Sequence, residues 1–508
     1  MKTPANVVTM LAVLLISLCF ASSGAAQGIP QSMALFQENC AVCHGENLEG
    51  TALGPPLLGD LRHGDTMTDI VASIRSGYET TGMPAWGRTF NDSQIRNLGL
   101  YISETRNNVT YTTFNYDTPL EIPEGLISTE LHDFRIEIVA EGLDAQPFSI
   151  EPLPDGRILL TEKMYGVRII DLDGQPSALI EGTPQVYDDT FIQAANQEWG
   201  WGWLFDVKLH PNYQQNGWIY LYFGDRCESC NAISRAAGDT PVSMNKLIRG
   251  RIEDNRWVDQ EVIWEADLEH YNTMVDVAAG GRITFDNQGH LYLSVGMKGP
   301  DNHHGIQDLS TPWGKVHRIY DDGTIPEDNP FANRADVYRS IFTYGHRSPQ
   351  GLEFDLKNGE LWGTEHGPRG GDEVNHLQAG RNYGWPLYSR GMDYDGTPVE
   401  YGRDLGIVFE LSDIEQPVVD LTPSPAVSSF IISDSDKFPG WRDHFLVGSL
   451  KARSLYRFQM ENNQLVQRET LFEGIARIRD IEQGFNGEIY LLLEHNSGSK
   501  IVRLVPVD

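Results

Sequence analysis

The sequence has few cationic side chains for its length, and this shortage excludes partners that are bound through clusters of positive charge. Lys and Arg total 39 against 71 Asp and Glu, which gives a formal net charge of −32 over 508 residues. Nucleic acids and anionic membrane surfaces bind through clustered Lys and Arg, so we expect neither as a partner. The composition is that of a globular protein, and the length requires more than one domain.

Long apolar segments are also lacking. The one candidate runs from Val7 to Ala21, after Lys2 and before small residues that end at Ala26. About 14 apolar residues are too few for a bilayer, which needs about 20. A charged start, a short apolar stretch and an A-x-A-like end are typical of a signal peptide. We therefore predict that residues 1–26 are cleaved, that the protein is exported to the periplasm, and that it has no stable membrane insertion.

Cysteine is rare as well, with five residues in the whole chain. Cys19 lies in the predicted signal peptide, and the other four form two CxxC pairs. The pair in CESC at 227–230 is too small for a zinc site without further ligands. Since export permits disulfides, we expect Cys227 and Cys230 to form one, with a free or redox-active pair as the alternative.

The other pair is followed by histidine, in CAVCH at 40–44. Cys-x-x-Cys-His is the attachment motif of c-type haem. The motif predicts thioether bonds from Cys40 and Cys43 to one covalent haem c, and coordination of its iron by His44.

The residues around this motif have helical periodicity. Met67, Ile70, Val71 and Ile74 keep the spacing of one apolar helical face. Asn91 and Asp92 can cap a second helix that carries Ile95, Leu98 and Ile102. We therefore predict an all-α domain over residues 30–112.

The sixth iron ligand should come from the far end of this domain. Met83 is our choice, because it lies on the loop GMPAW at 82–86, and a Met/His pair raises the haem potential. His63 and Met67 are rivals, but Met67 belongs to an apolar helical face. With the GPP loop at 54–56, these motifs resemble class I cytochromes c. The resemblance implies an electron-transfer module with both axial positions filled.

Residues 113–133 have no clear periodicity and predict a linker. Residues 134–508 contain a repeated pattern in which a turn residue and Gly precede alternating apolar residues. This pattern is typical of β-hairpins. Six copies at about 60 residues per unit predict an all-β six-bladed propeller, which leaves no long free strand edge. The copies are DGRIL at 155–159, NGWIY at 216–220, QGHLYL at 288–293, NGELW at 358–362, HFLVG at 444–448 and NGEIY at 486–490.

Five loop motifs resemble those of the soluble dehydrogenases for aldose sugars and glucose that depend on pyrroloquinoline quinone (PQQ), a family that includes sorbosone dehydrogenases. They are YGHRSPQG at 344–351, EHGPRGGDE at 365–373, NYGWP at 382–386, SLK at 449–451 and RIRD at 477–480. The resemblance implies hydride transfer from an alcohol, aldose or aldehyde to PQQ. Electrons then leave one at a time, here to a haem in the same chain.

The residue types in these motifs suit that cofactor. PQQ carries three carboxylates, and fixed cations bind them; arginine suits planar, bidentate contacts. The candidate cations are Arg347, Lys451, Arg477 and Arg479. By resemblance, the carbonyls of Gly367 and Pro368 hold Ca²⁺, which prefers oxygen ligands. Glu373 and Tyr383 match calcium-site positions, and Tyr394 matches a cofactor contact.

The catalytic base departs from the family pattern. In the family, the catalytic base is a histidine four residues before the Arg of a Gly-Gly-Arg motif, which here is residues 280–282. The residue at the position of the histidine is Ala278. Two further family positions on the substrate side also differ, at Trp201 and Ser348. Replacement candidates are Asp276, His303 and His304. Asp276 would share a face with Ala278 if this segment were a strand. Loss of a general base costs about 10²–10⁴-fold in rate.

Three functions stay open at this stage. The first is a periplasmic PQQ-dependent dehydrogenase for a small-molecule alcohol, sugar or aldehyde. It would reduce its own haem and then an external electron acceptor, such as another cytochrome or a terminal oxidase. The second is a non-catalytic or electron-relay protein that has lost the base. The third, a calcium-dependent hydrolase of lactones, leaves the haem and the cations without a role.

Overall fold

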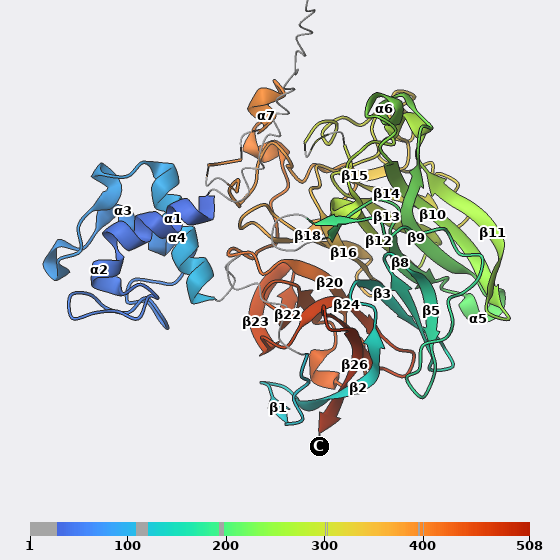
Figure 1. Cartoon of the computed structure of the whole chain (residues 1–508), viewed down its shortest axis with the longest axis horizontal. Coiled ribbons are helices and arrows are strands. Elements are labelled where there is room, and N and C mark those ends of the chain that lie inside the picture. The colour runs from blue at the N-terminus through green and yellow to red at the C-terminus, as the bar shows by residue number, and fades with distance from the viewer. Residues whose placement is uncertain are drawn as a thin grey trace, which may run out of the picture.

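The computed structural model describes residues 28–107, 120–192, 198–299, 301, 303–394, 397–399 and 401–507. A small helical lobe lies beside a large body of strands (Figure 1). The predicted signal peptide and residues 113–119 of the predicted linker lie outside the described residues. No helix in the described ranges is both long and apolar enough to cross a membrane.

The helical lobe contains four α-helices and two short 3-10 turns. They are α1 (Gly28–Asn39), α2 (Ala41–His44), α3 (Met67–Ser76), η2 (Glu79–Thr81), η3 (Trp86–Arg88) and α4 (Asp92–Arg106). Helix α4 packs against both α1 and α3. The Asn91 side chain caps α4, as its position in the sequence predicted, and Thr66 caps α3 in the same way.

The apolar faces predicted for these helices form the core of the lobe. Ile70 and Ile74 of α3 pack with Ile95 and Leu98 of α4, and all four side chains are buried. The helical N-terminal region is therefore confirmed.

The large body is a six-bladed β-propeller, as predicted. Each of six antiparallel sheets forms one blade. The first blade contains β3 (Pro147–Pro152), β4 (Ile158–Glu162) and β5 (Gly166–Ile170), and the second contains β8 (Leu204–Leu209), β9 (Ile219–Cys227), β10 (Val242–Glu253) and β11 (Arg256–Glu265). The third contains β12 (Gly280–Phe285), β13 (His290–Val295), β14 (Lys315–Tyr320) and β15 (Ile341–Tyr344), and the fourth contains β16 (Pro349–Asp355), β17 (Glu360–Glu365), β18 (Glu373–Leu377) and β19 (Val419–Asp420). The fifth contains β20 (Val427–Ile432), β21 (Phe445–Ser449), β22 (Leu455–Glu461) and β23 (Gln464–Phe472), and the last contains β24 (Arg477–Gln483), β25 (Ile489–Glu494), β26 (Ser499–Val507), β2 (Asp133–Leu143) and β1 (Ile127–Ser128).

The first strands of the blades line the centre of the propeller. β3, β8, β12, β16, β20 and β24 contact one another in a closed ring. Each copy of the sequence repeat leads into the second strand of a blade. Gly156 and Gly487, for example, have φ values of 91° and 77° at these turns, a conformation that favours glycine.

The last blade joins the two ends of the propeller sequence. β2 pairs antiparallel with β26, from Asp133 opposite Val507 to Leu143 opposite Ser499. Part of the predicted linker is built into this blade, since β1 pairs with β2 and Leu120 is buried in the same core. Residues 120–133 therefore pack on the propeller.

Short elements lie in the loops between these strands, both within and between blades. They are the strand pair β6 (Phe191–Ile192) and β7 (Glu198–Trp199), the helices α5 (Tyr213–Asn216), α6 (Ala232–Ala236) and α7 (Tyr401–Asp404), and the 3-10 turns η6 (Leu268–His270), η7 (Asp276–Ala278), η8 (Leu411–Asp413) and η9 (Pro439–Trp441).

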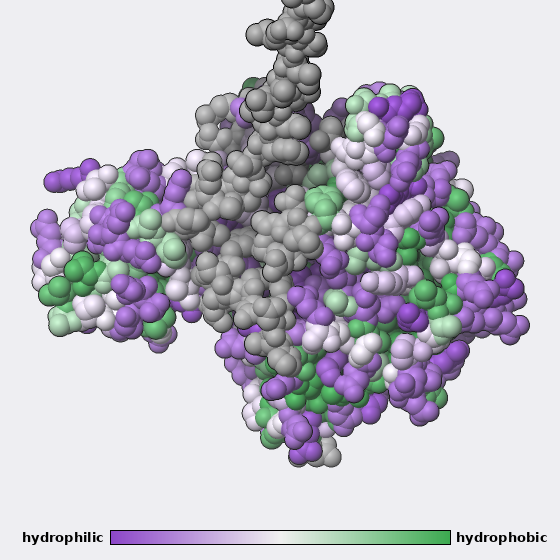
Figure 2. Space-filling view, in the orientation of Figure 1, coloured by the Kyte–Doolittle hydropathy of each residue, from purple (hydrophilic) through white to green (hydrophobic). Residues whose placement is uncertain are grey.

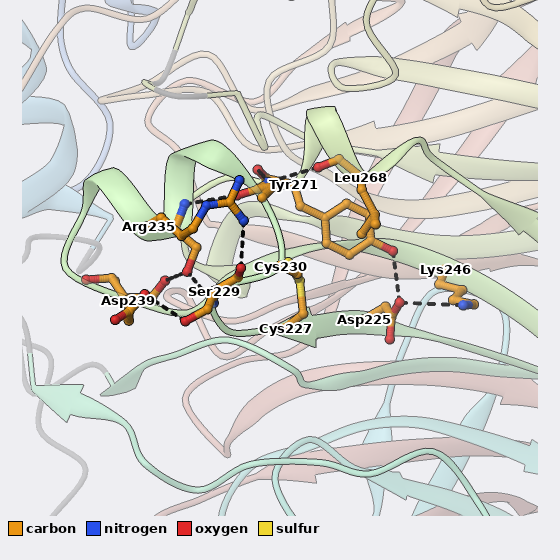
Figure 3. The surroundings of a disulfide bond; sticks show 12 residues. Asp225, Cys227, Ser229, Cys230, Arg235, Asp239, Lys246, Leu268 and Tyr271 are labelled. Carbon is orange, nitrogen blue, oxygen red and sulfur yellow. Dashed lines mark hydrogen bonds and ion pairs between the residues drawn. A yellow bond between two sulfur atoms is a disulfide. The ribbon is translucent and has the colours of Figure 1, made fainter.

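A disulfide joins Cys227, the last residue of β9, to Cys230, so the disulfide expected for this pair is confirmed. Figure 3 shows it beside a polar network in which Ser229 donates to Asp239 at 2.7 Å and Arg235 donates to the Ser229 carbonyl at 2.8 Å. These bonds hold the loop to helix α6, outside the centre of the propeller.

Candidate functional site

The haem-attachment motif has the geometry that a c-type haem requires. Cys40 and Cys43 are free, half-buried thiols; Cys40 is the N-cap residue of α2, and Cys43 lies within this helix. His44 Nδ1 lies 2.8 Å from the carbonyl oxygen of Pro55, in the predicted GPP loop. A hydrogen bond at Nδ1 fixes the ring and leaves Nε2 for a metal. The residues present therefore fit a covalent haem with His44 as its axial ligand.

The rival sixth ligands differ in their surroundings. Met67 packs against α4, where a Cβ at Gly99 would lie 3.3 Å from its methyl carbon. The His63 ring stacks on Tyr78 with centroids 3.8 Å apart. Met83 is half-buried on a turn that pairs with the Tyr78 backbone in both directions. Met67 thus serves helix packing, and Met83 stays our prediction for the sixth ligand.

Two of the predicted cofactor cations share one carboxylate in the propeller. Arg477 and Arg479, on β24, each bind one oxygen of Glu494 on β25 at 2.6 Å. Lys163, which follows β4, lies 3.8 Å from the same carboxylate, and all four residues are buried. Three cations therefore meet one anion, and the cluster retains positive charge that suits an anionic ligand.

The pKa values in this cluster follow from its burial and its charges. Burial, with Arg479 adding to it, lowers the pKa of Lys163 to about 7. Burial also lowers the pKa of Arg479. Although burial opposes ionisation of Glu494, the two arginines hold the pKa of this carboxyl far below its usual value. Glu494 is thus ionised at every physiological pH, while Lys163 titrates near neutrality.

Arg347 contributes a further cation on the turn between β15 and β16. Its guanidinium donates to the His366 carbonyl at 3.2 Å and to the Tyr394 hydroxyl at 3.3 Å, and lies over the Trp385 ring at 5.2 Å. Its Nε atom is buried and has no hydrogen-bond partner. A buried donor without a partner is costly, so this atom fits a ligand with acceptor oxygens.

His366 links Arg347 to the arginine pair. Its ring nitrogen Nε2 donates a hydrogen bond to Val427 O, 2.6 Å away. Burial lowers its pKa, and the charges of Arg347 and Arg479 lower it further, because both lie near the ring. The structure therefore brings the predicted cations of two different blades to one site.

The segment predicted to bind calcium is a tight loop between β17 and β18. A Cβ at Gly367 would lie 2.2 Å from the Gly370 carbonyl oxygen, so only glycine fits there. Asp372 holds the loop closed, because it accepts hydrogen bonds from the backbone of Gly367 at 3.0 Å and of Val427 at 2.9 Å. Pro368 follows Gly367 in this loop and is buried.

The remaining predicted calcium and cofactor residues surround this loop. Glu373 lies opposite Glu365 on neighbouring strands; burial, then the charge of Glu365, raise its pKa to about 8. Paired carboxylates of this kind fit a cation. The Tyr383 hydroxyl does not join them, because it donates to His376 O at 2.6 Å. Burial lowers the pKa of Lys451, and the nearby charge of Asp372 opposes this shift.

Asp276 is not free to act as a base. It lies in the 3-10 turn η7, so our assumption of a strand at this position was wrong. One carboxylate oxygen accepts hydrogen bonds from the backbone of Gly202 and Trp203, and the other from Ser243 and Lys298. The side chains of Lys298 and Asp276 are fully buried, so this ion pair is structural.

The two candidate histidines differ in position. The His303 ring stacks on Tyr401 with centroids 4.8 Å apart and an interplanar angle of 8°. Tyr401 contacts Trp385, which lies against Arg347, so His303 faces the wall of the cation site. His304 is more than half exposed and is hydrogen-bonded to Asp301.

The three positions that depart from the family pattern are buried or half-buried. Ala278 is buried, and its carbonyl oxygen lies 2.1 Å from where a Gly296 Cβ would be. Ser348 is buried, and its carbonyl accepts from the His366 backbone at 3.0 Å. Trp201 is half-buried and donates to Thr273 O at 3.0 Å.

Sequence reasoning missed Lys163, Glu494 and His366. Lys163 lies in the part of the chain with the weakest family resemblance, and a single lysine after a strand carries no signal. His366 and Glu494 could have been found, since His366 adjoins the GPRGG loop and Glu494 pairs with Arg477 across two neighbouring strands.

Comparisons with known proteins agree with this geometry. The family model described as Glucose / Sorbosone dehydrogenase matches residues 144–503, and that of Cytochrome C oxidase, cbb3-type, subunit III matches residues 29–102. The aldose sugar dehydrogenase YliI of Escherichia coli is 31% identical over 368 residues, 72% of this chain and 91% of that protein.

Solved structures and cytochromes extend the comparison. The apo-form of the soluble aldose sugar dehydrogenase from Escherichia coli is similar with a TM-score of 0.61 at 30% identity, over 74% of this chain and 100% of that one. In the helical domain, the cbb3-type cytochrome c oxidase subunit CcoP of Azospirillum brasilense is 34% identical over 84 residues, 15% of this chain and 28% of that protein.

Proposed function

Because the chain belongs to the glucose/sorbosone dehydrogenase family of PQQ-dependent enzymes and carries a cytochrome c domain, we propose that it oxidises a small alcohol, aldose or aldehyde and passes the electrons to its own haem. A haem tethered in the same chain is present at a high effective concentration, which favours it over a diffusing acceptor.

The observation that carries the proposal is the excess of buried cations. Lys163, Arg477 and Arg479 share the single carboxylate of Glu494, and Arg347 keeps a buried Nε without a partner. An anion with several carboxylates would neutralise this charge and supply the missing acceptor. The residues present therefore fit PQQ, and the loop at Gly367 with Glu373 nearby fits Ca²⁺.

When bound, PQQ with Ca²⁺ supplies the oxidant that takes hydride from the substrate. The chain's own residues would hold it: Arg477, Arg479 and Lys163 from one side and Arg347 from the other. Trp385 and Tyr401 form an aromatic wall between Arg347 and His303. Of the candidate bases, we assign the acceptance of the substrate proton to His303, because Asp276 is committed to structural bonds and His304 is more than half exposed.

The proposal also includes the cellular location of the protein and the external acceptor of its electrons. A c-type haem and the Cys227–Cys230 disulfide both suit an oxidising compartment, which supports export to the periplasm. The haem would then reduce an external acceptor, such as another cytochrome or a terminal oxidase. Neither nucleic acid nor a membrane has a role in this scheme.

The test is haem reduction followed optically in the oxidised holoprotein. PQQ and Ca²⁺ are added together or singly, against a panel of aldoses, alcohols and aldehydes. We expect substrate-driven haem reduction that requires both additions. Absence of PQQ binding in a calorimetric titration would remove the proposal and leave only the cytochrome domain.

One observation favours a second function. The family's base position is occupied by buried Ala278, and the nearest carboxylate, Asp276, is fully hydrogen-bonded. A propeller without a base would bind PQQ and relay electrons without oxidising a substrate. Tight PQQ binding with no substrate-driven haem reduction across the panel would support it.

A further inference from the structure

A buried ion pair joins the cytochrome domain to the propeller. Arg369 lies in the tight loop between β17 and β18, two residues after Gly367. Its guanidinium contacts both oxygens of Glu104 on α4, at 2.8 and 3.3 Å. The side chain of Arg369 is 0% exposed and that of Glu104 is 1% exposed.

Two helices of the cytochrome domain converge on this arginine. Asn97 of α4 accepts a further hydrogen bond from Arg369, and Ser32 of α1 lies 3.4 Å from it. Figure 1 shows α4 on the side of the helical lobe that faces the propeller, and α2 on the far side. The guanidinium therefore reaches out of one domain and is satisfied by the other.

The backbone of Arg369 is held as firmly as its side chain. Its N–H donates to Met392 O at 3.0 Å, and its carbonyl accepts from Met392 N at 2.9 Å. The charge of Glu104 also acts on Lys451, one of the predicted cofactor cations. The docking contact thus lies directly beside the loop and the lysine assigned to the cofactor.

A pair this deeply buried forms only when the domains are together. Separation would expose Arg369 and Glu104 to water, and closing with one partner missing would bury an uncompensated charge. Buried, bidentate Arg–carboxylate pairs also fix relative orientation, because both hydrogen bonds need one geometry. The contact therefore favours one position of the cytochrome domain.

We propose that the Glu104–Arg369 pair is the docking contact that holds the cytochrome domain on the cofactor loop for electron transfer within the chain. The proposal rests on the proposed function. In α4, Asn97 and Glu104 are seven residues apart and face the propeller, whereas Ile95, Leu98 and Ile102 face the core of the helical lobe.

The haem-attachment helix α2 lies away from this contact (Figure 1). α2 lies away from the propeller in Figure 1, and the apolar side chains beside the haem motif, Val42 and Leu53, are 65% and 70% exposed. Figure 2 shows apolar surface on this lobe among mostly hydrophilic residues.

The experiment compares two acceptors in the full-length holoprotein with PQQ and Ca²⁺. One acceptor is its own haem, and the other is a small soluble dye that takes electrons directly from the propeller. We expect Glu104→Gln to slow substrate-driven haem reduction by about tenfold or more, since small misplacements are costly, and to change dye reduction less than about twofold. Hydrogen exchange adds a readout that needs no turnover. The amides of 97–104 and 367–371 should exchange at least about tenfold faster in Glu104→Gln.

Asp92→Asn is the matched control, because it removes the same charge from the same helix. Asp92 pairs with Arg75 at 2.6 Å on the surface, where both side chains are exposed. It should leave both acceptors and the exchange rates unchanged. An unaltered haem spectrum in each variant shows that the domain has folded. A double variant, Glu104→Gln with Arg369→Gln, should be no slower than the single one, because the pair acts as a unit.

Equal haem reduction and unchanged exchange in Glu104→Gln would overturn the docking role. Slower reduction of haem and dye together would also overturn it, because the defect would then lie in the propeller site. Failure of the unaltered protein to reduce either acceptor would count against the proposed function, and the exchange rates would still decide whether Glu104 docks the domain.

Discussion

Lys163 lies 3.8 Å from Glu494, a carboxylate that already binds an arginine at each of its oxygens. One anion therefore offsets three buried cations before any ligand is bound. This imbalance favours the cluster as a site for an anionic ligand, and it makes Glu494 the residue on which the three cations depend.

Glu494→Gln should destabilise the protein strongly. It removes the one carboxylate shared by Lys163, Arg477 and Arg479, and breaking a buried pair costs about 3–5 kcal/mol. Urea unfolding of the PQQ-free protein measures this loss. The matched control is Glu137→Gln, which breaks an exposed pair with Arg503 and should change stability by less than about 0.5 kcal/mol. Equal effects of the two variants would contradict the assignment.

Binding of PQQ should depend on pH through Lys163. The pKa of Lys163 is lowered from 10.5 to about 7, so above pH 7 the folded site must take up a proton to pair with an anion. Affinity should then fall as pH rises above 7, by up to about tenfold per pH unit. Calorimetric titrations at pH 6, 7.5 and 8.5 measure it.

Lys163→Met should abolish this dependence, and Lys500→Met, which alters a surface pair with Glu141, should keep it. The same shift acts on stability in the opposite direction. Between pH 7 and 10.5 the unfolded chain binds the proton that folded Lys163 lacks, so this residue makes unfolding harder as pH rises. A pH-independent affinity in the unaltered protein would exclude Lys163 from the site.

Met83→Ala should lower the haem potential, because a Met/His pair raises it. A redox titration of the holoprotein measures the potential, and loss of the methionine–iron absorption band reports the ligand directly. Met67→Ala and His63→Ala are the matched variants, since Met67 packs near Gly99 and His63 stacks on Tyr78. A larger fall in potential for either of them would identify that residue as the ligand instead.

His303→Ala should reduce substrate-driven turnover by about 10²–10⁴-fold, the usual cost of losing a general base. Its neighbour provides the control, because His304→Ala changes an exposed histidine of the same loop. PQQ affinity should stay within about twofold in both, since neither residue is among the proposed cofactor cations. Full activity in His303→Ala would move the search for the base to the substrate itself or to bound water.

Much of the fold follows from local sequence patterns. Turn glycines mark the second strand of five of the six blades, and Asn91 marks the start of α4, because φ values above zero and helix caps restrict residue type. The strand assumed at Asp276 failed for a different reason. Its carboxylate is bound by groups 74 and 33 positions away, and contacts of that range have no local signature.

The candidate site was predictable in the same uneven way. Arg477 and Arg479 could be identified because they alternate on one strand within a distinctive motif. The partnership of Lys163 with Glu494 joins the first blade to the last, so only the closed ring brings them together. The contact of Arg369 with Glu104 spans 265 positions and joins two domains, and neither residue alone differs from an ordinary surface charge.

The pairing of β2 with β26 also sets an order of events during synthesis. Glu137 and Arg503, a bonded pair across these strands, are 366 positions apart. A ribosome must therefore translate almost the whole propeller before the first strand finds its neighbour. Until then β2 has an unpaired edge on the side that β26 will cover, and such an edge is a binding site for chaperones. A nascent chain released early would never bring Lys163 to Glu494, so the cofactor site would exist only in molecules that have been translated to the end of β26.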